Sequence, residues 1–469
     1  MVLHMTSQLM FVAIELIKSK QKVFCCYVYA SNSGVERRIL WNELRNIKAI
    51  TRGCPWLLMG DFNVTLNLEE HSAGGSKING DMQDFRDCVN DIEVEDINSS
   101  GMFFTWIKLP LKPETSVLKK LDRVMISTDF IDKYGNAYAS FLPFLISDHS
   151  PVVLHIPNTL DKKKKSFRFS NFVAEKPEFL DVVKKEWKCD CDGYSMYKLI
   201  QKMKRMKDPL NRIAWKNGNL FQNVKKLEAD VKMAQVEVEA NPSCSIRKEK
   251  LSQVLNEYNI AIDDEEKLLA QKAKVKWLSE GDKNTKYFHN VIKSRRNSNR
   301  VRGVCDENGN WFEGDNVAVQ FVNHFEKFLG NKGDVEQIEN PSELFTNKIS
   351  QGKAEDMVRE VTNKEIKDAI FDIGNDKAPG PDGFTTTFFK KSWEIVGNDV
   401  CDAVKEFFKA NKLLGEVNAT LITLVPKIQN PNKVSDFMPI ACCNVVYKCI
   451  SKIITKRIQE CLADIISIN

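Results

Sequence analysis

The chain has 469 residues, 43% of them hydrophobic and 28% charged, a composition that excludes a disordered tail and allows two or three folded domains. Its 68 basic and 63 acidic residues give a net charge of +5, which suits a polyanionic partner without requiring one. The apolar stretch Leu9–Ile17 is too short to span a bilayer and contains Glu15, so neither a membrane segment nor a targeting signal is predicted.

The 13 cysteines lie mostly in apolar runs. Cys189 and Cys191 have no second Cys or His pair at the spacing of zinc ligands. We therefore expect a reduced intracellular chain, in the nucleus or the cytoplasm.

The first region, to about residue 157, is predicted to contain short strands between turns. Leu9–Ile17 and Val23–Ala30 flank the polar turn Lys18–Lys22 and predict a hairpin. Trp56–Met59 is a continuous apolar run and predicts a buried strand. Between them a helix is expected to end at Gly53, with one apolar face formed by Ile39, Leu40, Leu44 and Ile47.

The run Lys162–Lys165 marks a boundary, after which the pattern is helical. One helix is expected to begin near Pro177, with Leu180, Val183 and Trp187 on one face. A longer helix is predicted from Ile246 to Trp277, and its many Lys and Glu residues indicate a solvated face. Its apolar positions are Leu251, Leu255, Tyr258, Ile262 and Leu269.

A third region begins near Thr362, which forms a predicted capping box with Glu365. The loop Pro379–Gly383 cannot be regular structure, and Leu421–Val425 predicts a strand. The helix after Thr362 buries Ile366, Ala369, Ile370 and Ile373, and a final helix buries Val446, Ile450, Ile453 and Ile458.

Three signals for chemistry share the first region. Asp61 and Asn63, placed by alternation on one face of a strand, could deprotonate and orient a water molecule. Asp148 precedes His149, and Asp122 adds a third carboxylate. Each signal alone is more typical of a turn or a structural histidine, but their occurrence together in one small domain favours a site.

These motifs resemble the later motifs of the endonuclease/exonuclease/phosphatase family, in the subtype of plant non-LTR retrotransposons. The segments that carry the resemblance are Tyr29–Asn32, Gly60–Asn63, Phe104–Trp106, Leu121–Arg123 and Ser147–Pro151. The resemblance implies a four-layer αββα sandwich that cleaves a phosphodiester with Mg²⁺ or Mn²⁺.

The resemblance also implies roles for single residues. Asp61 would activate the attacking water and Asn63 would orient it. His149 would contact the scissile phosphate, Asp122 would fix its imidazole, and Asp148 would lie at the metal. The substrate contacts would come from Tyr29, Asn32 and Trp106.

The chain departs from this family before Tyr29, where the family has strands carrying an Asn and a metal-binding Glu. The only acid there is Glu15, inside an apolar strand pattern. A divalent cation needs several anionic oxygens, so we expect the nuclease to be inactive or nearly so.

The segment Lys276–His289 resembles the connection between endonuclease and polymerase in the same elements. Lys293, Arg295, Arg296, Arg300 and Arg302 follow it. With the neighbouring aromatic residues they could neutralise phosphates and stack on bases, or they could form a solvated linker. Both interpretations remain open.

Further along, Lys377–Gly383, Leu424–Lys427 and Asp436–Ile440 resemble the start of a non-LTR reverse transcriptase, in the fingers. Lys427 is a candidate phosphate ligand. Met438 stands where the family has an Arg, and a thioether cannot make that bidentate contact. The catalytic aspartates of the palm lie beyond these motifs, so polymerisation is not expected.

The sequence therefore predicts four regions: residues 1–157, a partial αββα sandwich; 158–300, a helical basic linker; 301–361, a connector; and 362–469, an α+β reverse-transcriptase fingers fragment. The predicted function is a truncated, retroelement-derived protein with weak binding of DNA or RNA and no membrane partner. The alternatives are a residual metal-dependent DNA endonuclease and an interaction module built on the long helices.

Overall fold

The computed structural model describes residues 1–17, 21–74, 77–108, 113–157, 166–189, 191–274, 299, 301, 303–330, 349–428 and 431–465. Contacts within the chain divide it into two compact units, each assembled from three segments. The first unit comprises Met1–Lys162, Asn290–Lys332 and Leu424–Met438. The second comprises Lys163–His289, Gly333–Thr423 and Pro439–Asn469. These units do not coincide with the four consecutive regions expected from the sequence.

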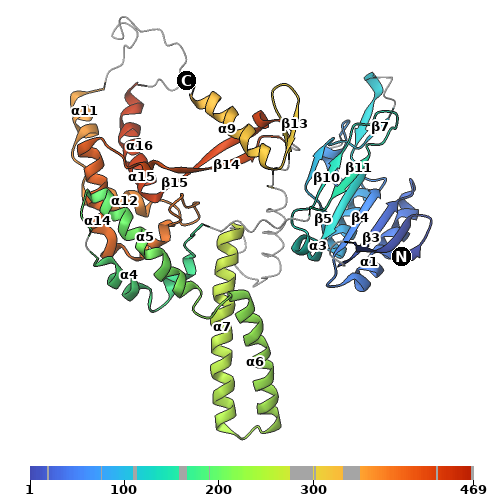
Figure 1. Ribbon diagram of the computed structural model, residues 1–469, viewed down its shortest axis with the longest axis horizontal. Helices are drawn as coiled ribbons and strands as arrows, with labels where there is room; N and C mark the ends of the chain where they lie inside the picture. Colours follow the sequence, from blue (N-terminus) through green and yellow to red (C-terminus); the bar gives the residue numbers. More distant parts are fainter. Residues whose placement is uncertain are drawn as a thin grey trace, which may run out of the picture. The chain divides into compact units, whose positions relative to one another are not determined.

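A six-stranded sheet with the order β1-β2-β3-β4-β9-β5 organises the first unit (Figure 1). β2 and β3 form the predicted hairpin, and β3 and β4 run parallel with helix α1 between them in the chain. The edge strand β1 was not expected. The six strands are β1 (Val2–Met5), β2 (Leu9–Leu16), β3 (Gln21–Tyr29), β4 (Trp56–Asp61), β5 (Val94–Asp96) and β9 (Asp122–Ser127).

Helices α1 (Gly34–Thr51) and α2 (Gly80–Ile92) cover one face of this sheet. The predicted face of α1 is correct for Leu40, Leu44 and Ile47, but Ile39 is 59% exposed. Trp41 takes the buried position instead, since it lies on the same face as Leu44 at a period of 3.6 residues. Its ring stacks against Phe85 of α2, with the centroids 4.9 Å apart.

A three-stranded sheet with the order β11-β10-β6 packs on the opposite face. Successive strand residues point to opposite sides, so Phe11 faces the helices whereas Val12 packs in the core shared with Phe141 of β10. The described residues of the first unit thus form three layers: helices α1 and α2, the six-stranded sheet and the three-stranded sheet. The strands are β6 (Ser99–Gly101), β10 (Tyr138–Phe141) and β11 (Val152–His155), and helix α3 (Thr128–Lys133) borders their core.

Shorter hairpins account for the remaining strands. β7 (Trp106–Lys108) pairs with β8 (Val117–Lys119), and β12 (Gly303–Cys305) pairs with β13 (Trp311–Glu313) before α9 (Asp315–Gly330). The predicted strand at 421–425 is confirmed as β14 (Thr420–Pro426), which pairs with β15 (Phe437–Cys443). Short 3-10 turns lie at Leu68–Glu70, Pro113–Thr115 and Val434–Asp436.

The second unit is helical and has one hydrophobic core. Phe169, Phe179 and Leu199 pack in the same cluster as Phe388 and Ile453, so the helices that contain Phe179 and Leu199, expected in the linker region, are part of this core. Their apolar faces require burial, which a solvated linker would not provide. The elements are a 3-10 helix (Asn171–Glu175), α4 (Phe179–Trp187), α5 (Ser195–Ala214), α11 (Gln351–Val358), α12 (Asn363–Phe371), α13 (Thr386–Lys391), α14 (Trp393–Ala410), α15 (Gly415–Asn418) and α16 (Val445–Ile465).

Most of the apolar faces predicted here are confirmed. The hydroxyl of Thr362 caps α12 by accepting a hydrogen bond from the backbone amide of Glu365 at 3.2 Å. Two positions are wrong: Leu180 is 50% exposed and Ile458 is 40% exposed. Phe179 replaces Leu180 in the core, because it lies four residues before Val183 on the buried face. The confirmed core positions are Val183, Trp187, Ile366, Ala369, Ile370, Ile373, Val446, Ile450 and Ile453.

α6 (Leu220–Ala240) and α7 (Ser245–Ala273) lie side by side in the second unit (Figure 1). Their surface carries ion pairs such as Lys250–Glu237 at 2.9 Å, in agreement with the predicted solvated face. The predicted end of the long helix at Trp277 lies outside the described residues. Among those residues, no helix is both long and apolar enough to cross a membrane.

Candidate functional site

Two carboxylates meet where neighbouring strands of the large sheet end and begin. Asp61 is the last residue of β4 and Asp122 is the first of β9, and the two are direct partners in the antiparallel pair. Partners of this kind have Cβ atoms about 4.5–5.5 Å apart. Asp61 is 7% exposed. The β4–β9 register therefore fixes the spacing of these two acids.

Asn63 joins Asp61 through a turn. β4 ends at Asp61, and Asn63 has a φ of +50°, in the left-handed region that Asn tolerates. Its backbone amide donates to Oδ1 of Asp61 at 2.8 Å, and its side-chain Nδ2 donates to the carbonyl of Ala30 at 2.7 Å. The expectation that both residues share a strand face is wrong, because the strand stops before Asn63.

Gly60 permits the close approach of β3 to this strand end. A Cβ at Gly60 would lie 2.0 Å from the carbonyl oxygen of Val28, and its φ is +137°. Any side chain would push apart the two parallel strands. The glycine before Asp61 is thus a requirement of the backbone.

His149 lies in the loop between β10 and β11 and completes the cluster. Its Nδ1 lies 2.9 Å from Oδ2 of Asp122, the contact that the resemblance implied. A carboxylate at Nδ1 favours the tautomer with its proton there, which leaves Nε2 as the reactive nitrogen. The ring is about one-third exposed, since its side chain has a relative exposure of 32%.

The charges of the cluster act on one another. Burial lowers the pKa of His149, but the hydrogen bond to Asp122 and the charges of Asp122, Asp61 and Asp148 raise it above its ordinary value overall. Burial raises the pKa of Asp61, and Asp122 adds to this effect, while the amide of Asn63 and the positive charges of His149 and Arg37 oppose it. The carboxylates outnumber the single imidazole, so the cluster holds excess negative charge.

Trp106 lies at the rim of the cluster. Its indole Nε1 donates to Oδ2 of Asp148 at 3.1 Å, and an isolated bridge pairs its backbone with that of His149. The ammonium of Lys119 lies 5.5 Å from the centre of its ring. An aromatic face beside a cation is a suitable contact for nucleic acid.

Tyr29 and Asn32 lie near the end of β4 that carries Asp61. Tyr29 ends β3, pairs in register with Asp61 and is 71% exposed. Asn32 is exposed in the loop that follows. Both side chains are therefore accessible, as the implied substrate contacts require.

A divalent cation does not fit the described side chains well. Carboxylate oxygens are the right ligands for Mg²⁺, but here one oxygen of each acid accepts a hydrogen bond from a protein group. No group of three or more His, Cys, Asp or Glu residues in the described part of the chain is arranged to hold a metal ion. Asp148, the implied metal ligand, is bonded to Trp106.

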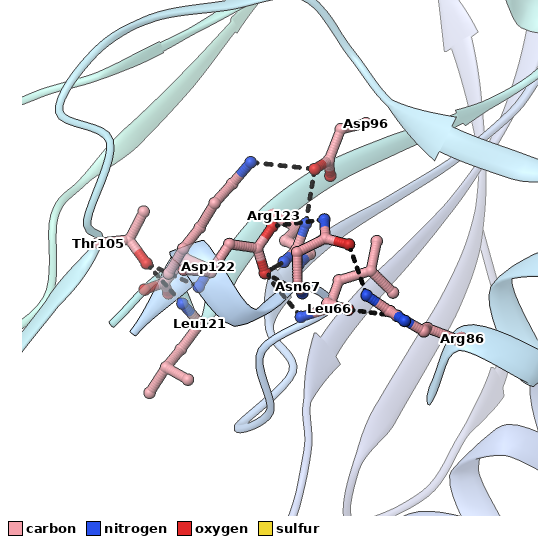
Figure 2. Close-up of polar contacts among 10 residues, drawn as sticks. Leu66, Asn67, Arg86, Asp96, Thr105, Leu121, Asp122 and Arg123 are labelled. Atoms are coloured by element: carbon pink, nitrogen blue, oxygen red, sulfur yellow. Dashed lines mark hydrogen bonds and ion pairs between the residues drawn. The ribbon is translucent and has the colours of Figure 1, made fainter. Parts of the chain in front are cut away.

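Thr105 is a residue of the site that the sequence analysis missed. It is fully buried, and its hydroxyl accepts hydrogen bonds from the amides of Leu121 at 2.9 Å and Asp122 at 2.8 Å (Figure 2). Its carbonyl accepts from the amide of Ser150 at 2.8 Å. Thr105 thus holds the segments of Asp122 and His149 together. Its position beside Trp106 in a motif was the available signal.

A buried charge network lies next to Asp122 (Figure 2). Arg123 is fully buried, forms an ion pair with Glu70 and lies 2.5 Å from Oδ2 of Asp96. Glu70 also accepts hydrogen bonds from the backbone amides of Leu66 and Asn67, at 2.6 and 3.0 Å. The network ties the loop after Asn63 to the strand that carries Asp122.

Similarity to known proteins is low. No protein-family model matches the chain. Over 461 residues it is 21% identical to the "Transposon TX1 uncharacterized 149 kDa protein" of Xenopus laevis, covering 94% of this chain and 34% of that protein. The similarity supports a retroelement protein. The chain spans about a third of the length of this relative.

Two solved structures are also similar to part of the chain. The endonuclease domain of TRAS1, a telomere-specific non-LTR retrotransposon, gives a TM-score of 0.27 at 13% identity, over 34% of this chain and 66% of that chain. A functionally unknown conserved protein from Enterococcus faecalis gives 0.20 at 16% identity, over 32% of this chain and 56% of that chain.

The remaining candidates of this retroelement-like chain lie elsewhere. Lys427 is exposed at the end of β14, and its ammonium donates to the carbonyl of Ser435 at 2.9 Å. Arg295, Arg296 and the other basic residues of 293–302 lie outside the described residues, as do Lys162–Lys165 and Lys276–His289. The nucleic-acid contacts expected from those segments stay predictions.

Proposed function

We propose that this protein is a retroelement-derived chain that keeps the acid–base arrangement of a phosphodiester-cleaving site without cleaving nucleic acid on its own. The observation that carries the proposal is the placement of the carboxylates. Asp61, Asp122 and Asp148 each accept a hydrogen bond from a protein donor, and among the described residues they do not converge as a set of three cation ligands.

The electrostatics of the cluster support the same proposal. A phosphate that approaches His149 also approaches several carboxylates, which repel it unless a cation or a proton compensates. We therefore propose that contact with DNA or RNA is weak and depends on basic residues at the rim, such as Lys119 beside Trp106. Residues 362–469, on this view, derive from the fingers of a reverse transcriptase and carry no polymerase chemistry.

The test is nicking of supercoiled DNA with Mg²⁺ or Mn²⁺. We expect no metal-dependent nicking by the purified chain, because the acids of the cluster are not arranged to hold a cation, together with binding of DNA that weakens steeply as salt is raised. Nicking that disappears in both Asp61→Ala and His149→Ala would contradict the proposal. Nicking that survives both substitutions would indicate a contaminating nuclease.

A residual DNA endonuclease is the second candidate, and one observation favours it. The hydrogen bond between His149 and Asp122 and the turn from Asp61 to Asn63 provide an imidazole, a base and an orienting amide at one strand edge. In this case Asp61 would deprotonate the water, Asn63 would orient it and His149 would meet the phosphate. The same nicking assay separates the two candidates.

A further inference from the structure

Arg37 is a buried arginine that lies beneath the loop Ala30–Ser33. It is 4% exposed and belongs to the first turns of α1. Its Nη1 donates to the carbonyls of Ser31 at 2.8 Å and Asn32 at 3.0 Å. Its Nη2 donates to Oδ2 of Asp81 at 2.7 Å. One guanidinium therefore connects this loop to α2.

The other end of the loop is bonded to the acid cluster. The amide of Ala30 donates to the carbonyl of Asp61 at 2.8 Å, and the side chain of Asn63 donates to the carbonyl of Ala30. The loop is thus held on one side by the site and on the other by Arg37. Its third residue, Asn32, keeps an exposed side chain.

The carboxylate of Asp81 lies beside the start of α1. A Cβ on Gly34 would lie 2.1 Å from Oδ1 of Asp81, so the carboxylate rests against the backbone of the first residue of α1. A side chain at position 34 would have to displace this carboxylate, whose side chain is 43% exposed.

Arg37 differs from the other arginines that join the same two helices. Arg38 pairs with Asp84 and Arg45 pairs with Asp91, both at 2.8 Å on the surface. Such exposed pairs are sufficient to link two helices, and burying a guanidinium has a large desolvation cost. The feature that Arg37 adds is its pair of bonds to the loop carbonyls.

We propose that Arg37, fixed by Asp81, is the positioning residue that presents the loop Ala30–Ser33, and with it Asn32, to a nucleic-acid phosphate. The choice of nucleic acid as the partner rests on the proposed function. The role of Arg37 in holding the loop does not. The positive charge of Arg37 also lowers the pKa of Asp61, which places it in electrostatic contact with the acid cluster.

The test compares Arg37→Met with Arg38→Met, a neighbour on the same helix whose side chain is 59% exposed. Amide hydrogen exchange is measured over residues 29–36 and over the rest of the first unit, without DNA. We expect exchange in Arg37→Met to accelerate within this loop and to stay unchanged in β4 and β9. In Arg38→Met it should stay unchanged throughout.

Binding of a labelled DNA duplex at low salt is the second readout. Affinity should fall about tenfold in Arg37→Met, because a loop that is no longer held must be ordered on binding, and should not change in Arg38→Met. Arg37→Lys keeps the charge but lacks the fork, so it should give an intermediate result in both measurements. It also supplies a folded variant if Arg37→Met does not fold.

Unchanged exchange in the loop of Arg37→Met, or acceleration spread evenly over the first unit, would overturn the role of Arg37. That role is also overturned if Arg38→Met or Arg37→Lys matches Arg37→Met in loop exchange. If the unaltered protein does not bind DNA at all, the proposed function fails. The exchange comparison still decides the role of Arg37 in that case.

Discussion

Thr105 connects the segment of Asp122 to that of His149 through its hydroxyl and its carbonyl. Replacing it with Val keeps the shape but leaves the amides of Leu121 and Asp122 without their acceptor. Unsatisfied groups of this kind cost about 1–3 kcal/mol, so Thr105→Val should lower the free energy of unfolding of the first unit by that amount. Urea unfolding followed through amide exchange in β9 measures it.

Thr105→Ser is the matched control, because it keeps the hydroxyl and loses only a methyl group. We expect it to retain most of the protection of the Asp122 amide. If Thr105→Val is as stable as Thr105→Ser, the hydroxyl does not hold these segments.

Asp382 gives the second unit a dependence on pH. Its Oδ1 accepts from the amide of Phe384 at 3.0 Å, but its Oδ2 is buried without a partner, and burial raises the pKa of the carboxyl to about 6. The unfolded chain has a pKa near 3.9. Between about pH 4 and 6 the folded protein binds more protons, so the free energy of unfolding should fall as pH rises through that window.

Asp382→Asn removes the ionisation and should abolish this fall. Its Tm at neutral pH should therefore exceed that of the unaltered protein by a few degrees, whereas the two should converge below about pH 4. Asp372→Asn is the control, since Asp372 is an acid at the surface of the same unit, paired with Lys452. An equal pH profile for the unaltered protein and Asp382→Asn would show that Asp382 stays ionised at little cost.

Sequence motifs also located Asp61, Asp122, Asp148 and His149, and in the structure the three carboxylates all act on the charge of His149. Their catalytic roles stay predictions. The supporting arginines could not be predicted, because Arg37 and Asp81 are 44 residues apart and Arg123 and Glu70 are 53 apart. Such pairs carry no local pattern, since only the fold brings them together.

Between elements, the ion pair of Arg123 and Glu70 joins β9 to the loop after β4. Arg123→Met leaves the buried carboxylate of Glu70 uncompensated, which should destabilise the first unit by about 3–5 kcal/mol. Adding Glu70→Gln removes that charge while keeping an acceptor for the amides of Leu66 and Asn67. The double variant should therefore recover about 1 kcal/mol or more in urea unfolding.

Arg86→Met is the control in the same region (Figure 2). Arg86 donates to the carbonyl of Leu66 and the side chain of Asn67, so its loss strands no buried charge. It should be milder than Arg123→Met. A double variant no more stable than Arg123→Met would mean that Glu70 is not the source of the penalty.

The elements that periodicity predicted are the long ones. α1, α12 and the hairpin β2–β3 each contain enough residues for a period of 3.6 or 2 to be visible. Strands β5 to β8 have three residues each, too few for any alternation. They exist because neighbouring strands supply their hydrogen bonds, which a single sequence does not reveal.

For the whole molecule, composition marked a change at Lys162–Lys165, and the contacts also divide the chain there. Composition could not indicate that residues 290–332 and 424–438 cluster with the first unit. Nor could it indicate that the core of the second unit joins Phe169 to Ile453. Helical pattern identified α4 as a helix, but whether a helix is a linker or a core element depends on which distant face covers it.

That shared core has a consequence for synthesis on the ribosome. Phe169, Phe179 and Leu199 leave the exit tunnel long before Val361–Ile453, the residues that cover them, are translated. At about 5–20 residues per second, these apolar faces stay uncovered for roughly 10–50 seconds in every nascent chain. During that interval they are substrates for chaperones and proteases, so the yield of intact protein depends on cellular quality control as well as on its final stability.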